Sequence, residues 1–278
     1  MAYRKQSEGR IADLETCRKA ILEITEEMKP MTVRQVFYQT VVRGLIHKTE
    51  HGYDRVAADL GAMRRNGELP YEWIVDNTRF EIRPTTFDSP ADALDSAAEN
   101  YLKSLWTNAG SCVQIWLEKD AISSIVSDVT WKYDVPLMVA RGFSSLSFLH
   151  SAAQQLKEID VPAYIYHLGD SDRYGKDAAN SIEADLRGFA PNTDITFERL
   201  AVTDKQIRQW RLPTRPPKRA GDPPAVEIDA ISPDRLRTIV QRAIEHHLPA
   251  NQFEKLKRAE RKEQRTITGL VKSLRRTS

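Results

Sequence analysis

Hydrophobic residues in the first third of the chain recur at helical spacing. An amphipathic helix is predicted over about the first 30 residues, up to Pro30, with Ile11, Leu14, Ile21, Leu22, Thr25 and Met28 near one face. Thr32 is expected to cap a second helix over 33–42, and a third follows over about 50–65. A short extended stretch around Tyr71, Trp73 and Val75 completes the pattern. Three helices and a small strand are typical of a winged helix-turn-helix.

From residue 112 the pattern changes to short apolar runs that alternate with amphipathic segments. We expect strands over 112–117, 136–140, 163–168 and 195–202, separated by helices over 121–131, 147–159 and 175–187. Strands that are apolar on both faces and alternate with helices are typical of a parallel sheet covered on both sides. The predicted fold class is therefore α/β, preceded by a mainly α domain.

Linker-like segments divide the chain into four expected parts. A winged-helix domain over 1–83 is followed by a linker and a connecting helix over 84–110, in which Ser89 and Pro90 begin a helix that runs to about Trp106. The α/β domain covers 111–212. The remainder, 213–278, holds a Pro-rich stretch, one more strand at 226–231, a helix from Ser232 to about Leu248 and a basic helical arm.

Composition narrows the class of protein. The chain has 278 residues, of which 41% are hydrophobic and 29% charged, as in ordinary globular proteins. No apolar run reaches the ~18 residues of a membrane span, and the polar start is unlike a signal peptide. The two cysteines are too few for a disulfide framework or a four-ligand zinc site. We expect a soluble, cytoplasmic protein, associated with the nucleoid if bacterial.

Charge is distributed unevenly along the chain. Residues 1–110 carry a net charge of −2 and residues 111–212 carry −3, whereas residues 213–278 carry +7. A basic terminal quarter suits a polyanionic partner, and a solvated helical tail is the alternative interpretation.

Carboxylates follow two of the predicted strands. Glu118 comes directly after the first strand, and Asp170 and Asp172 come after the third. Because the carboxyl ends of parallel strands meet at one edge of a sheet, these side chains are expected to lie together. A pair of alternating aspartates favours a hard divalent cation such as Mg²⁺, and a third acid could bind it or move a proton. Helix caps and surface acids are the alternative.

Three motifs together carry a family resemblance: LEKDA, ARGF and GDSDRYG. They resemble the Toprim domain of the topoisomerase VI A subunit and the meiotic double-strand-break transesterase. The corresponding motifs there are similar to V-E-K-D-A, G-[KR]-G-[FY]-P and D-x-D-P-Y-G. The chain departs at Ser144 and Arg173, where proline is usual. The stretch VEIDAISPDRL is also similar, though less specific. The resemblance implies a Rossmann-like Toprim sheet with Mg²⁺ on Asp170 and Asp172, and Glu118 as third ligand or general acid/base.

The same family places a catalytic tyrosine in an N-terminal winged helix, within a motif like R-[DE]-[IV]-[FY]-Y. The matching residues here run from Arg34 to Tyr38, with Gln35 at the acidic position, and the whole resemblance covers about 30–80 and 112–200. It implies that Tyr38 attacks a DNA phosphate while Arg34 neutralises developing charge. It also implies a homodimer in which the tyrosine of one protomer meets the acids of the other. A core tyrosine with a surface arginine is the alternative.

The sequence therefore predicts an Mg²⁺-dependent enzyme that cleaves double-stranded DNA by transesterification, in the manner of topoisomerase VI A. Expected DNA contacts are Arg55, Arg64, Arg65, Arg141, Lys257, Arg258 and Arg261. Strand passage would require a separate ATPase subunit, because the chain contains no P-loop motif. Two other hypotheses stay open: a hydrolytic Toprim nuclease of phage or plasmid-defence type, and a non-catalytic winged-helix DNA-binding protein.

Overall fold

A four-stranded parallel sheet forms the centre of the molecule. The computed structural model describes residues 13–76, 84–107, 109–142, 144–217, 221–249 and 252–277. The strands are β1 (Cys112–Leu117), β2 (Leu137–Val139), β3 (Ala163–Leu168) and β4 (Ile195–Ala201), in the order β2-β1-β3-β4. The predicted α/β class and the positions of all four strands are confirmed.

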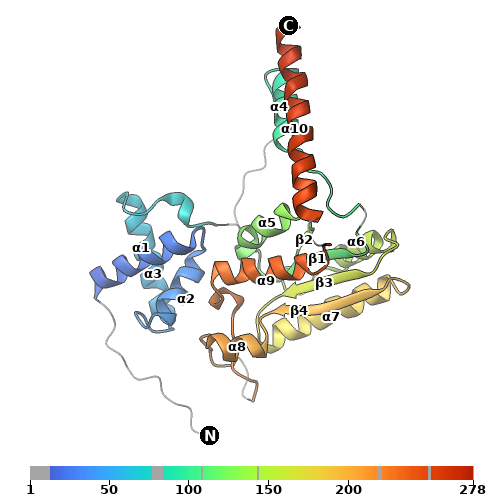
Figure 1. Ribbon diagram of the computed structural model, residues 1–278. Coiled ribbons are helices and arrows are strands. Elements are labelled where there is room, and N and C mark those ends of the chain that lie inside the picture. The colour runs from blue at the N-terminus through green and yellow to red at the C-terminus, as the bar shows by residue number, and fades with distance from the viewer. Residues whose placement is uncertain are drawn as a thin grey trace.

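Helices cover both faces of the sheet (Figure 1). On one face, α5 (Ser123–Lys132) packs against α9 (Pro233–Glu245), and buried side chains of both helices belong to the same apolar core as Ile115 and Leu117 of β1. On the other face, α6 (Leu146–Lys157) and α7 (Arg173–Phe189) enclose Trp116. Successive residues of β1 thus enter opposite cores, which is why the strand reads as a continuous apolar run.

Three N-terminal helices stand beside the carboxyl edge of the sheet. They are α1 (Leu14–Met28), α2 (Val33–Val42) and α3 (Glu50–Arg65). Thr32 caps α2 in a reciprocal capping box with Gln35, and this cap explains why the predicted start is correct. The single turn η3 (Ile228–Ala230) packs against α2, and one apolar core is continuous from α1 to α9. The helix that carries Tyr38 is therefore in contact with the edge of the sheet.

Three local predictions were wrong. The stretch around Tyr71 is not extended: it is the turn η1 (Tyr71–Trp73), followed by one bridge between Ile74 and Met31. The rest of the expected wing, at 77–83, lies outside the described residues. The connecting helix α4 (Pro90–Glu99) stops well before Trp106, because the Asn100 amide donates to a carbonyl of the last turn. The strand expected at 226–231 is only a bridge from Val226 to Ser171, followed by η3.

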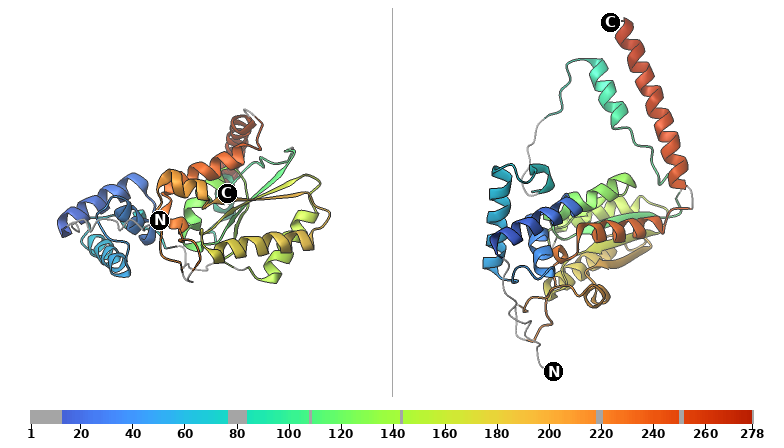
Figure 2. Two further views of the ribbon diagram at one scale, coloured as in Figure 1. Left: turned by 90° about the horizontal axis from the view of Figure 1, so that it is seen from below. Right: turned by 60° about the vertical axis from the view of Figure 1, so that its left-hand side comes forward.

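The last helix forms an arm with α4. The helix α10 (Gln252–Thr277) lies along α4, and the pair extends away from the sheet (Figures 1 and 2). The remaining elements are the turn η2 (Asp120–Ile122) and the helix α8 (Asp204–Trp210). Within the described part of the chain, none of the helices combines the length and the apolar character that crossing a bilayer requires.

Candidate functional site

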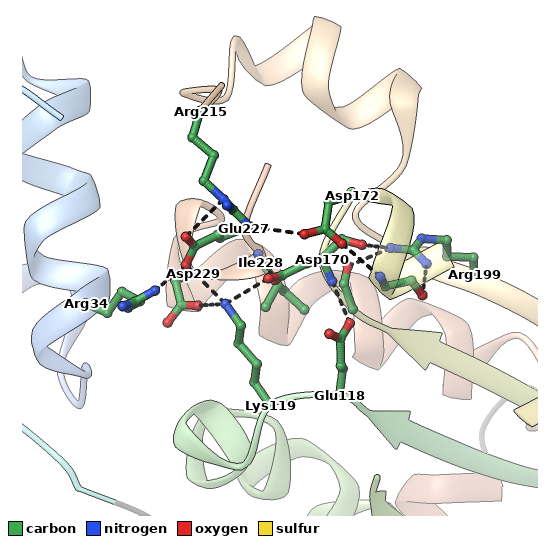
Figure 3. A network of polar contacts seen from close by, with 12 residues as sticks. Arg34, Glu118, Lys119, Asp170, Asp172, Arg199, Arg215, Glu227, Ile228 and Asp229 are labelled. Atoms are coloured by element: carbon green, nitrogen blue, oxygen red, sulfur yellow. Dashed lines mark hydrogen bonds and ion pairs between the residues drawn. The ribbon is translucent and has the colours of Figure 1, made fainter. Parts of the chain in front are cut away.

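The predicted acids meet at the carboxyl end of the sheet. Strands β1 and β3 pair in register through Leu117 and Leu168, so the residues that follow them emerge side by side. The backbone N–H of Asp170 donates to Oε2 of Glu118 at 2.9 Å (Figure 3). The backbone of Asp170 and the carboxylate of Glu118 are therefore in direct contact, where the two strand ends converge.

The two aspartates of the D-x-D motif have different partners. Asp170 is only 7% exposed, and its Oδ1 accepts from the backbone N–H of Ile228 at 2.9 Å. Asp172 caps α7 by accepting from the Gly175 N–H at 2.8 Å, and its other oxygen lies 3.0 Å from the Arg215 guanidinium. Asp170 thus faces the centre of the acidic cluster, while Asp172 is held at its rim.

Lys119 is the central cation of the cluster, a role that was not predicted from the sequence. Its Nζ lies 3.1 Å from Asp170, 3.2 Å from Glu227 and 2.9 Å from Asp229 (Figure 3). Burial lowers the pKa of this amine, but the three carboxylates outweigh that effect and raise it. Lys119 is therefore a permanent positive charge among the acids.

The carboxylates respond to this arrangement in opposite ways. Burial and the neighbouring charge of Asp170 raise the pKa of Glu118, and burial raises that of Asp170 even though Lys119 opposes it. Burial also raises the pKa of Glu227, yet Lys119 and Arg34 reverse the shift and hold it at about 2. Glu118 and Asp170 are therefore the acids whose charged forms a further cation would favour.

Several features fit a hard cation near Glu118 and Asp170. All donors are carboxylate oxygens, as Mg²⁺ prefers. A Cβ at Gly169 would lie 2.4 Å from Glu118 Oε2, so glycine makes room for that carboxylate. Three buried polar atoms nearby have no hydrogen-bond partner in the described part of the chain: Oδ1 of Asp229 and both ring nitrogens of His167.

The side chains are not arranged as a finished metal site. Within the described ranges, no three His, Cys, Asp or Glu residues are grouped so that they could hold an ion as they stand. Asp172 is occupied by its cap and by Arg215. Since Mg²⁺ keeps several waters and commonly takes only one or two protein carboxylates, the residues fit a loosely held ion.

Arg34 and Tyr38 lie on the adjoining wall, formed by α2. The Arg34 guanidinium donates to Glu227 Oε2, which links α2 to the acidic cluster. Tyr38 is 2% exposed, and its hydroxyl makes no hydrogen bond to any residue within the described ranges. Burial, then the charges of Glu227 and Asp229, raise the pKa of this hydroxyl, and Lys119 and Arg34 offset part of the rise.

Two cavities connect α2 to the cluster. A cavity of about 620 Å³ is lined by Tyr38, Arg34, Lys48 and Glu227, among others. A second, of about 570 Å³, is lined by Arg34, Arg64 and Lys119. Lys48 Nζ lies 4.9 Å from the centre of the Tyr38 ring and donates to the carbonyl of Pro213. Tyr38 therefore faces a cavity that Glu227 also lines, and Lys119 and Asp229 line the second one.

The residues predicted to contact DNA are distributed over separate surfaces. Arg55, Arg64 and Arg65 are on α3, Arg141 pairs with Asp120 beside the loop after β2, and Lys257, Arg258 and Arg261 are on α10. Only Arg64 lines a cavity that Lys119 also lines. Lys257 is turned inward and pairs with Glu260.

Four residues around the acidic cluster were not predicted, and the sequence near them contains at most a weak indication of their role. Glu227 and Asp229 form an E-x-D alternation like the D-x-D motif, and this pattern could have indicated two acids with a common direction. Lys48 and Arg215 come from loops, and nothing in their local sequence indicates that they approach the site.

No protein family model, no curated protein and no solved structure gives a significant match to this chain.

Proposed function

We propose that this protein cleaves double-stranded DNA by transesterification, with Tyr38 as nucleophile and Glu118, Asp170 and Asp172 as the acids of a Toprim-like site. In this interpretation α1–α3 are a winged-helix domain and the parallel sheet is a Toprim domain. The observation that supports the proposal is that the segment with Arg34 and Tyr38 is connected by ion pairs to the acidic cluster, although the two are far apart in the sequence. Arg34, one turn from Tyr38, is ion-paired with Glu227, and Glu227 shares Lys119 with Asp170.

Different residues of the chain would have different roles in the proposed reaction. Oη of Tyr38 forms a bond to the phosphorus while the bond from phosphorus to the 3′ oxygen breaks, leaving a 5′-phosphotyrosyl link and a 3′-hydroxyl. Arg34 faces the same cavity and would neutralise charge on the phosphoryl oxygens. Glu118 and Asp170 would hold Mg²⁺, with Asp172 at the rim of the site, and the bound ion would supply positive charge that stabilises the scissile phosphate and the leaving oxygen.

A hydrolytic nuclease is the second candidate. It is favoured by the burial of Tyr38, which raises the pKa of the hydroxyl and so disfavours the phenolate. Water would then replace the tyrosine as nucleophile at the same acids.

A covalent-adduct assay separates the two candidates. Supercoiled plasmid is incubated with the protein and Mg²⁺, quenched with detergent and analysed with and without protease. We expect protein-linked DNA ends that Tyr38→Phe and Asp170→Ala abolish. Tyr53→Phe is the matched control, because Tyr53 lines the same cavity. Free ends that persist in Tyr38→Phe but not in Asp170→Ala would establish hydrolysis, and no cleavage would contradict both candidates.

Mixing inactive chains tests the proposed homodimer. If the tyrosine of one protomer serves the acids of its partner, a mixture of Tyr38→Phe and Asp170→Ala chains regains part of the cleavage. If each tyrosine serves the acids of its own chain, the mixture stays inactive. The latter result would fit the Arg34–Glu227 pair within one chain and would overturn the exchange between protomers.

A further inference from the structure

Two acidic residues of α10 have fixed partners within the arm formed by α4 and α10 and the segment between α4 and β1. Glu260 and Glu263 of α10 face inward: Glu260 accepts from the backbone N–H of Lys103 at 2.9 Å and pairs with Lys257 at 2.8 Å, and Glu263 pairs with Lys103. Val271, 1% exposed, lies on the same inner face. These acids are therefore fully used in attaching α10 to the body of the protein.

One exposed face of α10 carries a row of cations, which we call the ridge. Its members are Lys255, Arg258, Lys262, Arg265 and Lys272, and all five are exposed. They recur at intervals of three, four, three and seven residues, with Gly269 in the gap, so they follow one face of the helix. None forms an ion pair with a residue inside the described ranges.

The ridge is long, straight and accessible. From residue 255 to residue 272 it spans about 26 Å at the ordinary helical rise. The α4–α10 pair stands away from the sheet in both views (Figures 1 and 2), and Arg265 and Lys272 border a hollow that Ala98 and Glu99 of α4 also line. Among the described residues, none of the ridge cations forms an ion pair with the acidic cluster.

The side chains of the ridge favour one class of negatively charged partner over the others. A membrane-bound helix would offer an apolar face to lipid, but the inner face of α10 is packed on α4. An acidic protein partner would be anchored by apolar or aromatic side chains, and the ridge has none. What remains is a row of exposed point charges, which suits a series of phosphates.

We propose that the ridge of α10 binds the phosphate backbone of duplex DNA, without reading its sequence, as a surface separate from the cleavage site. This interaction goes beyond the proposed cleavage and needs neither the tyrosine nor a metal. Lysine and arginine contacts to phosphates release condensed counterions, so the affinity conferred by the ridge falls steeply with salt.

The test measures binding of the full chain to a labelled duplex by fluorescence anisotropy, in EDTA, over a series of salt concentrations. One variant carries Arg258→Gln, Lys262→Gln, Arg265→Gln and Lys272→Gln. The control carries the same charge change at four exposed helical positions elsewhere: Lys19→Gln, Lys157→Gln, Lys205→Gln and Arg242→Gln. Circular dichroism confirms that both variants are folded.

We expect the ridge variant to bind at least tenfold more weakly at low salt, with a salt slope smaller by about 3, and the control to lose less than threefold. Equal weakening of both variants would overturn the proposal in favour of net charge alone, and unchanged binding by the ridge variant would overturn it outright. Because binding is measured in EDTA and cleavage is measured with Mg²⁺, failure of cleavage and failure of DNA binding by the ridge are observed separately.

Discussion

Two regions of this molecule are rich in charge and use it in opposite ways. At the carboxyl end of the sheet, Lys119 and its carboxylates are buried and each has a fixed partner. On the ridge of α10, the cations are exposed and have no partner inside the described ranges. Because the first region is buried, the stability of the fold there depends on each of its charges. Because the ridge is exposed, it tolerates substitution, and its electrostatic interactions are weakened by salt.

The largest contrast is expected from removing one lysine in each region. Lys119→Met leaves Asp170, Glu227 and Asp229 without their common cation, and we expect a loss of about 3–5 kcal/mol in the free energy of unfolding. The matched change Lys262→Met on the ridge is expected to stay within about 0.5 kcal/mol. Urea unfolding at neutral pH without Mg²⁺ measures both.

Lys119→Arg keeps the charge and is expected to recover part of the lost stability. Similar losses for Lys119→Met and Lys262→Met would contradict the distinction between the two regions.

A pair of glycines tests how tightly the acidic cluster is packed. In Gly169→Ala, the new Cβ would lie 2.4 Å from Glu118 Oε2 and 2.7 Å from His167. We expect a loss of about 1–3 kcal/mol and a marked fall in DNA cleavage, because the Glu118 carboxylate must move. Thermal unfolding and the plasmid assay report the two effects.

Gly188→Ala is the control, since a Cβ there meets nothing within 4 Å and the residue lies in α7. It is expected to stabilise the protein by about 0.5–1 kcal/mol. If Gly169→Ala were equally harmless, the close approach of Glu118 to the backbone would be refuted.

The smallest expected effect concerns Lys48 and pH. Burial lowers the pKa of its amine to about 8, against the opposing charge of Glu227. The unfolded chain holds this proton up to about pH 10.4, so the folded state is penalised below pH 8 and the penalty disappears as the pH rises from 8 to 10. Arg215, Arg34 and Asp170 also act on this amine.

Lys48→Met removes that titration. We expect the stability of the unmodified chain, relative to Lys48→Met, to increase between pH 8 and pH 10 in urea unfolding. A difference between the two that does not change with pH would show that the amine titrates normally in the folded protein.

Much of the fold could be predicted from local sequence, but only some of the residues in the acidic cluster could. The bounds of α2 and α3 were predictable because Thr32 and Thr49 cap them, and β1 and β3 were predictable as apolar runs. Glu118 and Asp170 were predictable because strand ends in a parallel sheet converge. The three-way pairing of Lys119 was not, since its partners come from two loops more than 50 residues away.

The ion pair between Arg34 and Glu227 has a consequence for which molecules can compete for this site. An incoming phosphate must exchange with a carboxylate that already satisfies the guanidinium, so a single small anion gains little by binding. A polymer that is tethered elsewhere on the protein arrives at a high effective concentration and can make the exchange. We therefore expect inorganic phosphate and free nucleotides to inhibit DNA cleavage only weakly. The affinity of a polyanion for this site should depend more on its length than on its charge density.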